Sequence, residues 1–551
     1  MSVFDSRPWD KNWNAEMLQA RPLEYETGLD MFLTSALADP QQPLISYFET
    51  TLTAAEVDEQ SDAFACWLQA RGIGRGDRIA LYLQNVPEFV LSVIAAWKLG
   101  AVPVPINPMY RERELNELLM DSGAKVLVLL EHLWHDVAHS VVDGTAVELV
   151  VSTNGLAYLG TTDPVPTVLS DLHPQPVESS TPFSSAIEEF RGSQPQIADV
   201  TADDVAYLCY TSGTTGPPKG AMVSHRGVVF SSQNFRDMRG LVPGDVVFAV
   251  APLFHITGLI CTIAVGLLVP MRMVLGYRFD VGESLKLIEK YRCSFTVGAT
   301  TVFIAFLSHP EFADRDISTL QKIVCGGAPI PPSVLERYET ATGVYMYNGY
   351  GLTESTSPTF GTPSGRRSPV DPVSGALALG VPLPGTDLVI LDDAGKPVGY
   401  DEPGEVVVRG PHVVKGYWNK PEETVNAIQD GWLRTGDVAF MDSDGWVYMV
   451  DRKKDVINAS GYKVWPREVE EVLYEHPSVR EAAVVGVPDD YRGETVKAFV
   501  SLRPGEKATV EELIEFTKGK LAAYKYPRII EIIDDLPKTV TGKILRRELR
   551  K

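Results

Sequence analysis

Early in the chain, apolar runs alternate with helical patterns. The runs at 79–83, 101–106 and 125–130 are separated by helical patterns at 85–100 and 111–121. Successive parallel strands need a long crossover connection, which is usually a helix, so this alternation is typical of a mostly parallel sheet covered by helices. The sequence therefore predicts an α/β fold for the first part of the chain.

The pattern becomes strand-rich after residue 377. Candidate strands at 387–391, 404–408 and 446–450 are separated by Gly/Asp turns. At 551 residues the chain also exceeds what one hydrophobic core usually organises, so at least two domains are expected. We expect these strands to form a strand-rich subdomain within the larger domain.

The pattern changes again beyond residue 451, where a polar segment at 452–455 leads into a new set of elements, and a domain boundary is expected at 451–454. Helices are expected over 464–476 and 510–521, and strands over 482–487 and 497–502. These elements would make a small α+β unit.

We therefore predict a large N-terminal domain over 1–451 and a small C-terminal α+β domain over 452–551. Two stretches are expected to be irregular: 161–185, rich in Pro, Ser and Thr, as a long exposed connection, and 361–375, with several Pro and Ser residues. The apolar stretch at 256–275 is interrupted at Pro270 and Arg272, well short of the roughly 20 clean residues that a membrane span needs. A buried helix leading into a strand is expected there.

Composition excludes some functions. The formal net charge of −22 argues against a nucleic-acid or anionic-membrane binder, because those partners are negative themselves. The five cysteines are scattered and form no C-x-x-C pair, which favours a reduced, cytoplasmic chain over a disulfide framework or a zinc site. The first residues lack the apolar core of a secretory signal. A homodimer is left open.

A hydroxyl- and glycine-rich loop, Y-T-S-G-T-T-G-P-P-K-G, spans residues 210–220. Glycines permit the close backbone approach that a polyanion needs, the hydroxyls are donors, and Lys219 adds a positive charge. The loop is not a Walker A motif, because Pro218 precedes the lysine and Gly220 follows it, in place of glycine and Ser/Thr. A surface turn is the competing interpretation.

Other segments combine with this loop. N-G-Y-G-L-T-E at 348–354 supplies an amide, an aromatic ring, a hydroxyl and a carboxylate; T-G-D at 435–437 supplies a turn carboxylate; and P-K-T-V-T-G-K-I-L spans 537–545. With N-P-M-Y-R-E-R-E-L at 107–115, they resemble the adenylate-forming acyl-CoA synthetase superfamily, which includes beetle luciferases and the adenylation domains of peptide synthetases. The resemblance covers essentially the whole chain.

The resemblance implies a two-step reaction. A carboxylate attacks the α-phosphate of ATP to give acyl-AMP and pyrophosphate, and the thiol of coenzyme A then displaces AMP. The first step brings an anion to an anion, so positive charge and Mg²⁺ must neutralise the developing charge. The co-substrates and cofactor implied are therefore ATP, coenzyme A and Mg²⁺.

Family positions assign the nucleotide site. Asn348 would read the adenine amino group, Tyr350 would stack on the adenine, Asp437 would accept the ribose hydroxyls, and Glu354 would hold Mg²⁺. The implied ATP- and AMP-binding residues are Thr211, Ser212, Gly213, Thr214, Thr215, Gly216, Lys219, Gly327, Ala328, Pro329, Asn348, Gly349, Tyr350, Gly351, Thr353, Asp437, Arg452 and Lys543.

Lys543 is the catalytic residue that the resemblance emphasises most. It would bridge the carboxylate and the phosphate during adenylation and leave before thioester formation, with the small domain moving. The competing interpretation is a solvated lysine in a basic tail that also holds Arg546, Arg547 and Arg550. The turn at Thr541 and Gly542, taken with the other motifs, favours the catalytic role.

The resemblance also assigns the moving parts. Arg452 would contact the ribose and phosphate, with a hinge near 452–454 at Lys454. Rotation would exchange Lys543 for a coenzyme A loop at Ser460, Gly461 and Tyr462. A plain polar interdomain linker is compatible with this interpretation.

Two assignments concern the acid. His255 is either a structural histidine or a group that orients the carboxylate, and the catalytic set implied is then Lys543, Thr353, Glu354 and His255. Cys325 is interpreted as a small buried residue without thiol chemistry. The walls of the acyl pocket are assigned to His255, Ile256, Thr257, Gly258, Thr300, Val302, Phe303 and Gly326.

These mostly apolar walls favour a hydrophobic monocarboxylic acid, fatty or aryl, and the sequence predicts an ATP-dependent carboxylate:CoA ligase. Chain length is not readable, because a methylene changes discrimination by only about 1–3 kcal/mol. One alternative delivers the acyl group to a carrier protein or to oxygen. Another class of alternative is a non-catalytic acyl- or nucleotide-binding protein.

Overall fold

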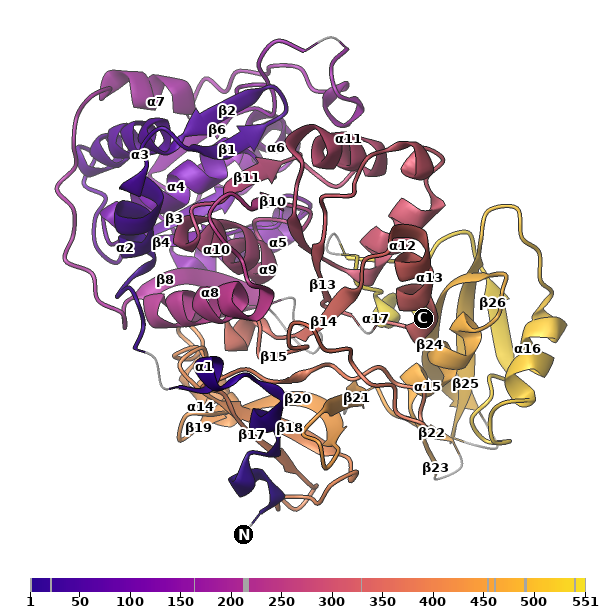
Figure 1. Cartoon of the computed structure of the whole chain (residues 1–551). Coiled ribbons are helices and arrows are strands. Elements are labelled where there is room, and N and C mark those ends of the chain that lie inside the picture. Colours follow the sequence, from indigo (N-terminus) through magenta and orange to yellow (C-terminus); the bar gives the residue numbers. More distant parts are fainter. Residues whose placement is uncertain are drawn as a thin grey trace.

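The computed structural model describes residues 2–19, 22–162, 164–211, 218–328, 330–452, 455–459, 462–489, 493–539 and 542–550. In these ranges, four sheets with their helices, one of the sheets a two-stranded hairpin, make up most of the chain before residue 452, and a fifth sheet follows it (Figure 1). The predicted α/β class, with a strand-rich subdomain and a C-terminal α+β unit, is confirmed.

The first sheet is the predicted parallel one, in the order β4-β3-β5-β6-β7. Its helix α4 begins at Pro87, where the missing N–H costs nothing, and every residue of α4 is buried. The strands are β3 (Arg78–Tyr82), β4 (Val102–Pro105), β5 (Val126–Leu130), β6 (Leu149–Thr153) and β7 (Thr181–Pro182), and the helices are α3 (Ala54–Gln69), α4 (Pro87–Lys98), α5 (Glu112–Ser122), α6 (Glu131–Asp136) and α7 (Phe183–Glu189).

The second sheet has nine strands in the order β16-β15-β14-β13-β12-β10-β11-β1-β2, parallel from β14 to β1 and antiparallel at both edges. Its strands are β1 (Pro43–Tyr47), β2 (Thr50–Thr53), β10 (Val246–Phe248), β11 (Arg272–Leu275), β12 (Phe295–Gly298), β13 (Lys322–Gly326), β14 (Met346–Tyr350), β15 (Phe360–Gly361) and β16 (Val381–Pro382). Its helices include α8 (His225–Arg239), α11 (Val281–Tyr291), α12 (Thr300–Ser308) and α13 (Pro332–Thr342).

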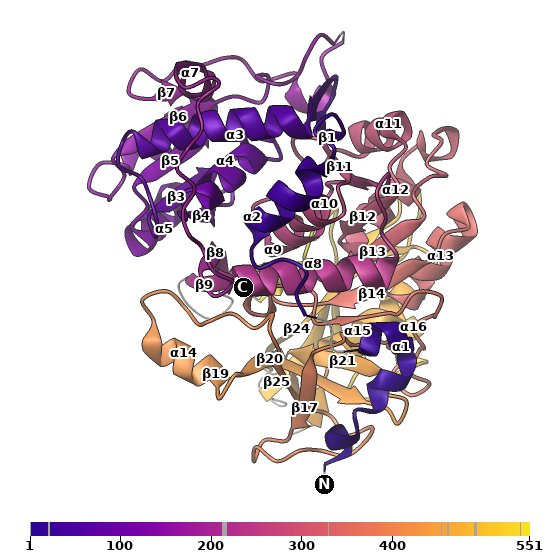
Figure 2. The same cartoon turned by 60° about the vertical axis from the view of Figure 1, so that its left-hand side comes forward.

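Helix α8 crosses the middle of the molecule, between these sheets and the strand-rich sheet (Figure 2). It follows the hairpin of β8 (Val205–Thr211) and β9 (Lys219–Ser224), whose connection is the glycine-rich loop. The strand-rich sheet comprises β17 (Asp387–Leu391), β18 (Gly404–Arg409), β19 (Ile428–Gln429), β20 (Trp432–Met441) and β21 (Val447–Arg452), with α14 (Pro421–Ala427) beside it.

The C-terminal unit lies beside α12, α13 and β21, at the right in Figure 1. Its buried residues form clusters of their own between Ile457 and Leu549, separate from the cluster that runs from Phe4 to Tyr448. Its elements are β22 (Ile457–Ala459), β23 (Tyr462–Val464), α15 (Pro466–Tyr474), β24 (Val479–Asp489), β25 (Gly493–Leu502), α16 (Val510–Lys518), β26 (Ile529–Ile532) and α17 (Arg546–Leu549).

Two predictions about segments have different outcomes. The stretch 161–185 was expected to be an exposed connection, which is wrong in part: Leu169 is fully buried, and the stretch ends in β7 and the start of α7. The stretch 256–275 is confirmed as a buried helical segment, α9 (Ile256–Gly258), a π-helical turn and α10 (Val265–Leu268), leading into β11. Across the described ranges, no helix has the length and apolarity to cross a membrane.

Candidate active site

Lys543 lies on a tight turn of the C-terminal unit. The Thr539 hydroxyl accepts a hydrogen bond from the Lys543 N–H at 3.0 Å, and the Thr539 N–H donates to the Lys543 carbonyl at 2.7 Å. A further bond, from the Leu545 N–H to the Pro537 carbonyl at 2.8 Å, closes the base of the turn. The backbone that carries the predicted catalytic lysine is therefore held at both ends.

This turn contacts α12 of the nine-stranded sheet. The Thr301 hydroxyl donates to the Gly542 carbonyl at 3.3 Å. A Cβ at Gly542 would come within 2.2 Å of that hydroxyl oxygen, and Gly542 has a φ of +80°, so only glycine fits this contact. The C-terminal unit thus brings Lys543 against the first turn of a helix more than two hundred residues earlier in the chain.

His255, a residue of the large unit, lies close enough to Lys543 for the charge of the lysine to act on its ring. Its Nδ1 accepts a bond from the Thr257 N–H at 3.3 Å, which places the proton of the neutral ring on Nε2. Loss of solvation, and secondly the positive charge of Lys543, lower the pKa of His255 to about 4. The ring is therefore neutral near pH 7.

Asn85 holds the segment that leads to His255. Its amide donates to the carbonyls of Ala249 and Ala251 at 3.0 and 3.3 Å, and its oxygen accepts from the Leu253 N–H at 2.8 Å. Asn85 is buried. From the sequence it was interpreted only as the start of a helix, because its three partners lie more than 160 residues away.

Of the predicted adenine and ribose residues, Tyr350 and Asp437 are in direct contact, one from each of two sheets. Tyr350, at the end of β14, donates its hydroxyl to Asp437 of β20 at 2.7 Å, across 87 residues of sequence. Asn348 is buried and donates to the Ala378 carbonyl at 2.9 Å. Arg452 pairs with Asp437 between β21 and β20, and its side chain lies outside the described atoms. The structure therefore brings Tyr350, Asp437 and Arg452 together.

Small residues are required where β13 and β14 end side by side. Gly326 is paired with Gly349, and a Cβ at Gly326 would come within 2.7 Å of the Gly349 carbonyl oxygen. Gly327 follows with a φ of +79° and is exposed, and Ala328 is half-buried. Pro329 lies outside the described residues.

Glu354 and Lys219 meet at a residue that the sequence did not single out. The Tyr417 hydroxyl donates to Glu354 Oε1 at 2.8 Å, and Lys219 Nζ lies 5.2 Å from the centre of the Tyr417 ring, a cation–π distance. Thr353 lies beside Glu354 in a short 3-10 turn. Tyr417 comes from 63 residues later than Glu354, which is why local motifs missed it.

The two ends of the glycine-rich loop are anchored. Thr211 and Lys219 are paired across β8 and β9, and the Tyr210 hydroxyl donates to Asp121 at 2.6 Å. The segment around Tyr417 lies against β9, with the Trp418 N–H donating to the Gly220 carbonyl at 2.7 Å. The loop residues themselves lie outside the described part: Ser212, Gly213, Thr214, Thr215, Gly216 and Pro217.

The predicted acyl-pocket residues lie in or beside three elements, α9, α12 and β13, and the last two are in contact. Thr300, at the start of α12, contacts Cys325 of β13 at 3.3 Å between Oγ1 and Sγ. Ile256, Val302 and Phe303 are buried. Gly258 leaves no room for a side chain, because a Cβ there would come within 2.1 Å of a backbone carbonyl oxygen.

The Cys325 thiol and the Glu354 carboxylate remain to be considered for the chemistry of the site. Burial raises the pKa of the Cys325 thiol to about 12, so it is a thiol and not a thiolate at neutral pH. Within the described ranges no three His, Cys, Asp or Glu residues gather as a metal site. A single carboxylate such as Glu354 nevertheless fits Mg²⁺, which proteins hold by one or two carboxylates together with substrate phosphates.

The residues predicted for the hinge and the coenzyme A loop are mostly beyond what the structure describes. Lys454, Ser460 and Gly461 lie outside the described residues, and Tyr462 is described only in its backbone, at the start of β23.

Comparisons with known proteins cover nearly the whole chain. The family model of AMP-binding enzymes matches residues 32–418, and that of the AMP-binding enzyme C-terminal domain matches residues 468–543. A long-chain-fatty-acid–CoA ligase of Bacillus subtilis is 36% identical over 98% of this chain and 97% of its own. One of Yersinia pestis is 37% identical with the same coverage, and a feruloyl-CoA synthase of Amycolatopsis is 35% identical over 94% and 97%.

Solved structures match as broadly. An anthranilate CoA ligase in complex with anthranoyl-AMP has a TM-score of 0.86 at 28% identity, covering 96% of this chain and 97% of its own. MatB from Rhodopseudomonas palustris, 28% identical over 96% and 98%, has a TM-score of 0.83 with ATP bound and 0.74 without ligand. The chain belongs to the AMP-binding enzyme family, the adenylate-forming superfamily that includes the AMP-forming acyl-CoA synthetases.

Proposed function

We propose that this protein is an AMP-forming acyl-CoA ligase that activates a long-chain fatty acid. The observation that carries the proposal is the docking of the Gly542–Lys543 turn on Thr301, beside His255. An attacking carboxylate and an α-phosphate are both negative and repel each other. Adenylation therefore requires a positive charge, such as a lysine, between the acyl pocket and the nucleotide site. The curated relatives named as fatty-acid–CoA ligases favour the fatty acid.

On this proposal the large unit binds the nucleotide. Asp437 would accept the ribose hydroxyls, its position fixed by the Tyr350 hydroxyl, and Asn348 would face the adenine. Lys219 and the loop before it would hold the departing phosphates. Glu354, oriented by Tyr417, would hold Mg²⁺, which when bound would neutralise charge on the phosphate oxygens.

His255 would orient the acid without exchanging a proton. Since its pKa is about 4, the ring is neutral at physiological pH, and Nε2–H is left as a hydrogen-bond donor. A neutral donor near a carboxylate positions it without reducing its nucleophilicity as strongly as a cation would. Lys543 would then supply the charge at the reacting atoms.

We propose a boundary at residues 451–454, with Lys454 as the hinge. The separate buried clusters on the two sides of this boundary support the division. After adenylation the small domain would rotate, withdraw Lys543 and present Ser460, Gly461 and Tyr462 to the pantetheine arm of coenzyme A. We place the protein in the cytoplasm, in keeping with five free, buried cysteines.

The choice of acid rests on the apolar walls. Ile256, Val302 and Phe303 offer no positive charge to a second carboxylate. An aryl acid is the second candidate, favoured by the feruloyl and anthranilate relatives. Rates of acyl-CoA formation over a panel of aliphatic and aromatic acids would decide, with highest kcat/KM expected for long aliphatic chains.

The experiment that tests the class of reaction uses ATP, the acid panel and coenzyme A. The proposal expects AMP, pyrophosphate and a coenzyme A thioester in equal amounts. Accumulation of acyl-AMP without any thioester would instead indicate delivery to a carrier protein or to oxygen. Binding of ATP and acid without pyrophosphate release would indicate a non-catalytic binding protein.

A further inference from the structure

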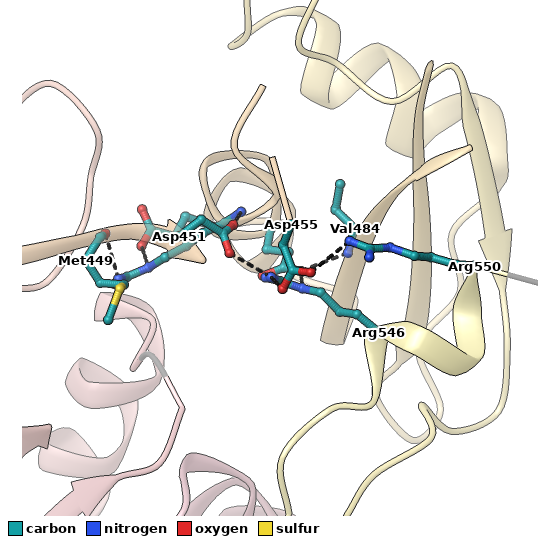
Figure 3. A network of polar contacts seen from close by, with 9 residues as sticks. Met449, Asp451, Asp455, Val484, Arg546 and Arg550 are labelled. Atoms are coloured by element: carbon teal, nitrogen blue, oxygen red, sulfur yellow. Dashed lines mark hydrogen bonds and ion pairs between the residues drawn. The ribbon is translucent and has the colours of Figure 1, made fainter. Parts of the chain in front are cut away.

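Three carboxylates surround Arg546, three residues after Lys543 (Figure 3). The guanidinium binds Glu470 with two nitrogens, at 3.0 and 2.6 Å, and Asp451 with a third, at 2.9 Å. Asp455 lies 3.6 Å from the nitrogen that binds Asp451, and it also accepts from Arg550 at 2.9 Å. A planar fork held by several acids has one orientation, so α17 and the turn before it are fixed.

The carboxylates belong to different parts of the molecule. Glu470 lies on α15 and is anchored to β24 by the Val484 N–H at 2.8 Å, so it belongs to the C-terminal unit. Asp455 follows the proposed hinge and belongs to the same unit. Asp451 alone of the three lies before it, on β21, where it is paired with Val438 of the strand-rich sheet. Rotation of the C-terminal unit would leave Asp451 behind.

Asp451 makes a second contact across the same boundary. Its Oδ2 accepts from the N–H of Arg467 at 3.1 Å, while Oδ1 accepts from Arg546. Arg467 also donates to the Met449 carbonyl at 2.9 Å. Asp451 is 4% exposed, so these bonds are little screened by solvent.

The C-terminal unit therefore meets the large unit at Asp451 and, at a separate place, through the Thr301–Gly542 contact. Two separated contacts determine the angle between two rigid bodies far better than one. We propose that Asp451 is a positioning residue for Lys543: by binding Arg546 and the Arg467 N–H, it holds the C-terminal unit at the angle that delivers Lys543 to the adenylation site. The inference rests on the proposed function.

Asp451 then acts in one half-reaction only. The Asp451 contacts must break when the unit rotates, whereas Glu470 and Asp455 move together with Arg546 and keep their bonds. The better superposition on ATP-bound than on ligand-free MatB agrees with this being the adenylating arrangement. The contact thus favours adenylation and contributes nothing to thioester formation.

Asp451→Asn tests this, with Asp455→Asn as the matched control. Adenylation is measured as acid-dependent pyrophosphate release without coenzyme A, and thioester formation from supplied acyl-AMP and coenzyme A. Asp451→Asn should slow adenylation about tenfold, the effect of one hydrogen bond to a charged group, and leave thioester formation within about twofold of the wild type. Asp455→Asn should change the ratio of the two rates by less than about twofold. Equal losses in both half-reactions of Asp451→Asn, or no loss, would overturn the inference.

A second measurement does not depend on catalysis. Spin labels at two exposed positions, Ala313 beside α12 and Glu511 on α16, report the distance between the units in ligand-free protein. Asp451→Asn should broaden or shift the distance distribution, and Asp455→Asn should leave it unchanged. An unchanged distribution in Asp451→Asn would refute the positioning role even if the protein proved to be no ligase. If the wild type formed no acyl-AMP while Asp451→Asn still shifted the distance distribution, the proposed function alone would be refuted.

Discussion

The two lysines of the candidate site are held in different ways. Lys219 starts β9, inside a hairpin clamped by backbone bonds from the segment at Tyr417. Lys543 belongs to another unit, whose turn at Gly542 accepts one hydrogen bond from Thr301 and whose Arg546 binds Asp451 near the boundary. On the proposed function, the first lysine would be a permanent part of the site, and the second would be placed there by an interface. On the same proposal, only the second could be withdrawn without unfolding part of the large unit.

The largest effect is expected from Lys543→Ala. Adenylation should fall about 10²–10³-fold, because the charge aimed at the reacting oxygens is lost. Thioester formation from supplied acyl-AMP should persist. Lys219→Ala, in the permanent half, should slow adenylation only about tenfold and raise the KM for ATP. Equal losses from both lysines in both half-reactions would remove the distinction between them.

Asp437→Ala tests the proposed ribose-binding carboxylate, which belongs to the large unit. The KM for ATP should rise about thirtyfold, because two charge-assisted bonds are lost and the Tyr350 hydroxyl is left without its acceptor. The KM for the acid should stay unchanged. Tyr350→Phe keeps the ring and should raise the KM for ATP less than Asp437→Ala does. An equal rise would mean that the Tyr350 hydroxyl alone fixes the position of the Asp437 carboxylate.

Tyr417→Phe examines the link between Glu354 and Lys219. The ring over Lys219 remains, while the hydrogen bond to Glu354 is removed. The Mg²⁺ concentration for half-maximal adenylation should rise about fivefold, since the carboxylate is no longer oriented. Titration of the rate with Mg²⁺ measures this. A lower kcat at saturating Mg²⁺ with no change in the midpoint would contradict an orienting role.

The smallest effect on the reaction is expected from the two buried histidines His412 and His255, whose pKa values are both low. Burial lowers the pKa of His412 to about 4, and both of its ring nitrogens lack a described partner beside stacked Phe230. The unfolded state therefore binds more protons between pH 6.5 and 4, and stability falls as pH decreases through that range. For fully buried His412 the loss from pH 7 to 5 is about 2 kcal/mol.

Unfolding by urea at several pH values tests this. His412→Phe should flatten the decrease in the free energy of unfolding below pH 6.5. Above pH 5 the adenylation rate of the wild type should show no titration from His255, whose pKa is also about 4. A bell-shaped rate profile with an acidic limb near 6.5 that His255→Asn abolishes would show that His255 is protonated in the working enzyme.

Local patterns determined much of the fold. β17 has the bounds that apolar alternation predicted, 387–391, and the alternation at 79–130 predicted three parallel strands and two helices. The family motifs supplied the predicted site residues; of these, Tyr350 and Asp437 contact each other between two sheets, and Gly542, next to Lys543, contacts Thr301 between the two units. The stretch 161–185 was predicted less well, because burial of Leu169 depends on a neighbour that composition does not reveal.

The sequence by itself determined the elements, the family and the residue types that adenylation needs. Only the tertiary structure decided that Tyr417 joins Glu354 to Lys219, that Asn85 holds the segment before His255, and that Asp451 binds Arg546 across the boundary. The physical reason is separation along the chain. Strand and helix periodicity arises within a few residues, whereas these contacts join groups between 63 and 198 residues apart, and no local pattern encodes such a meeting.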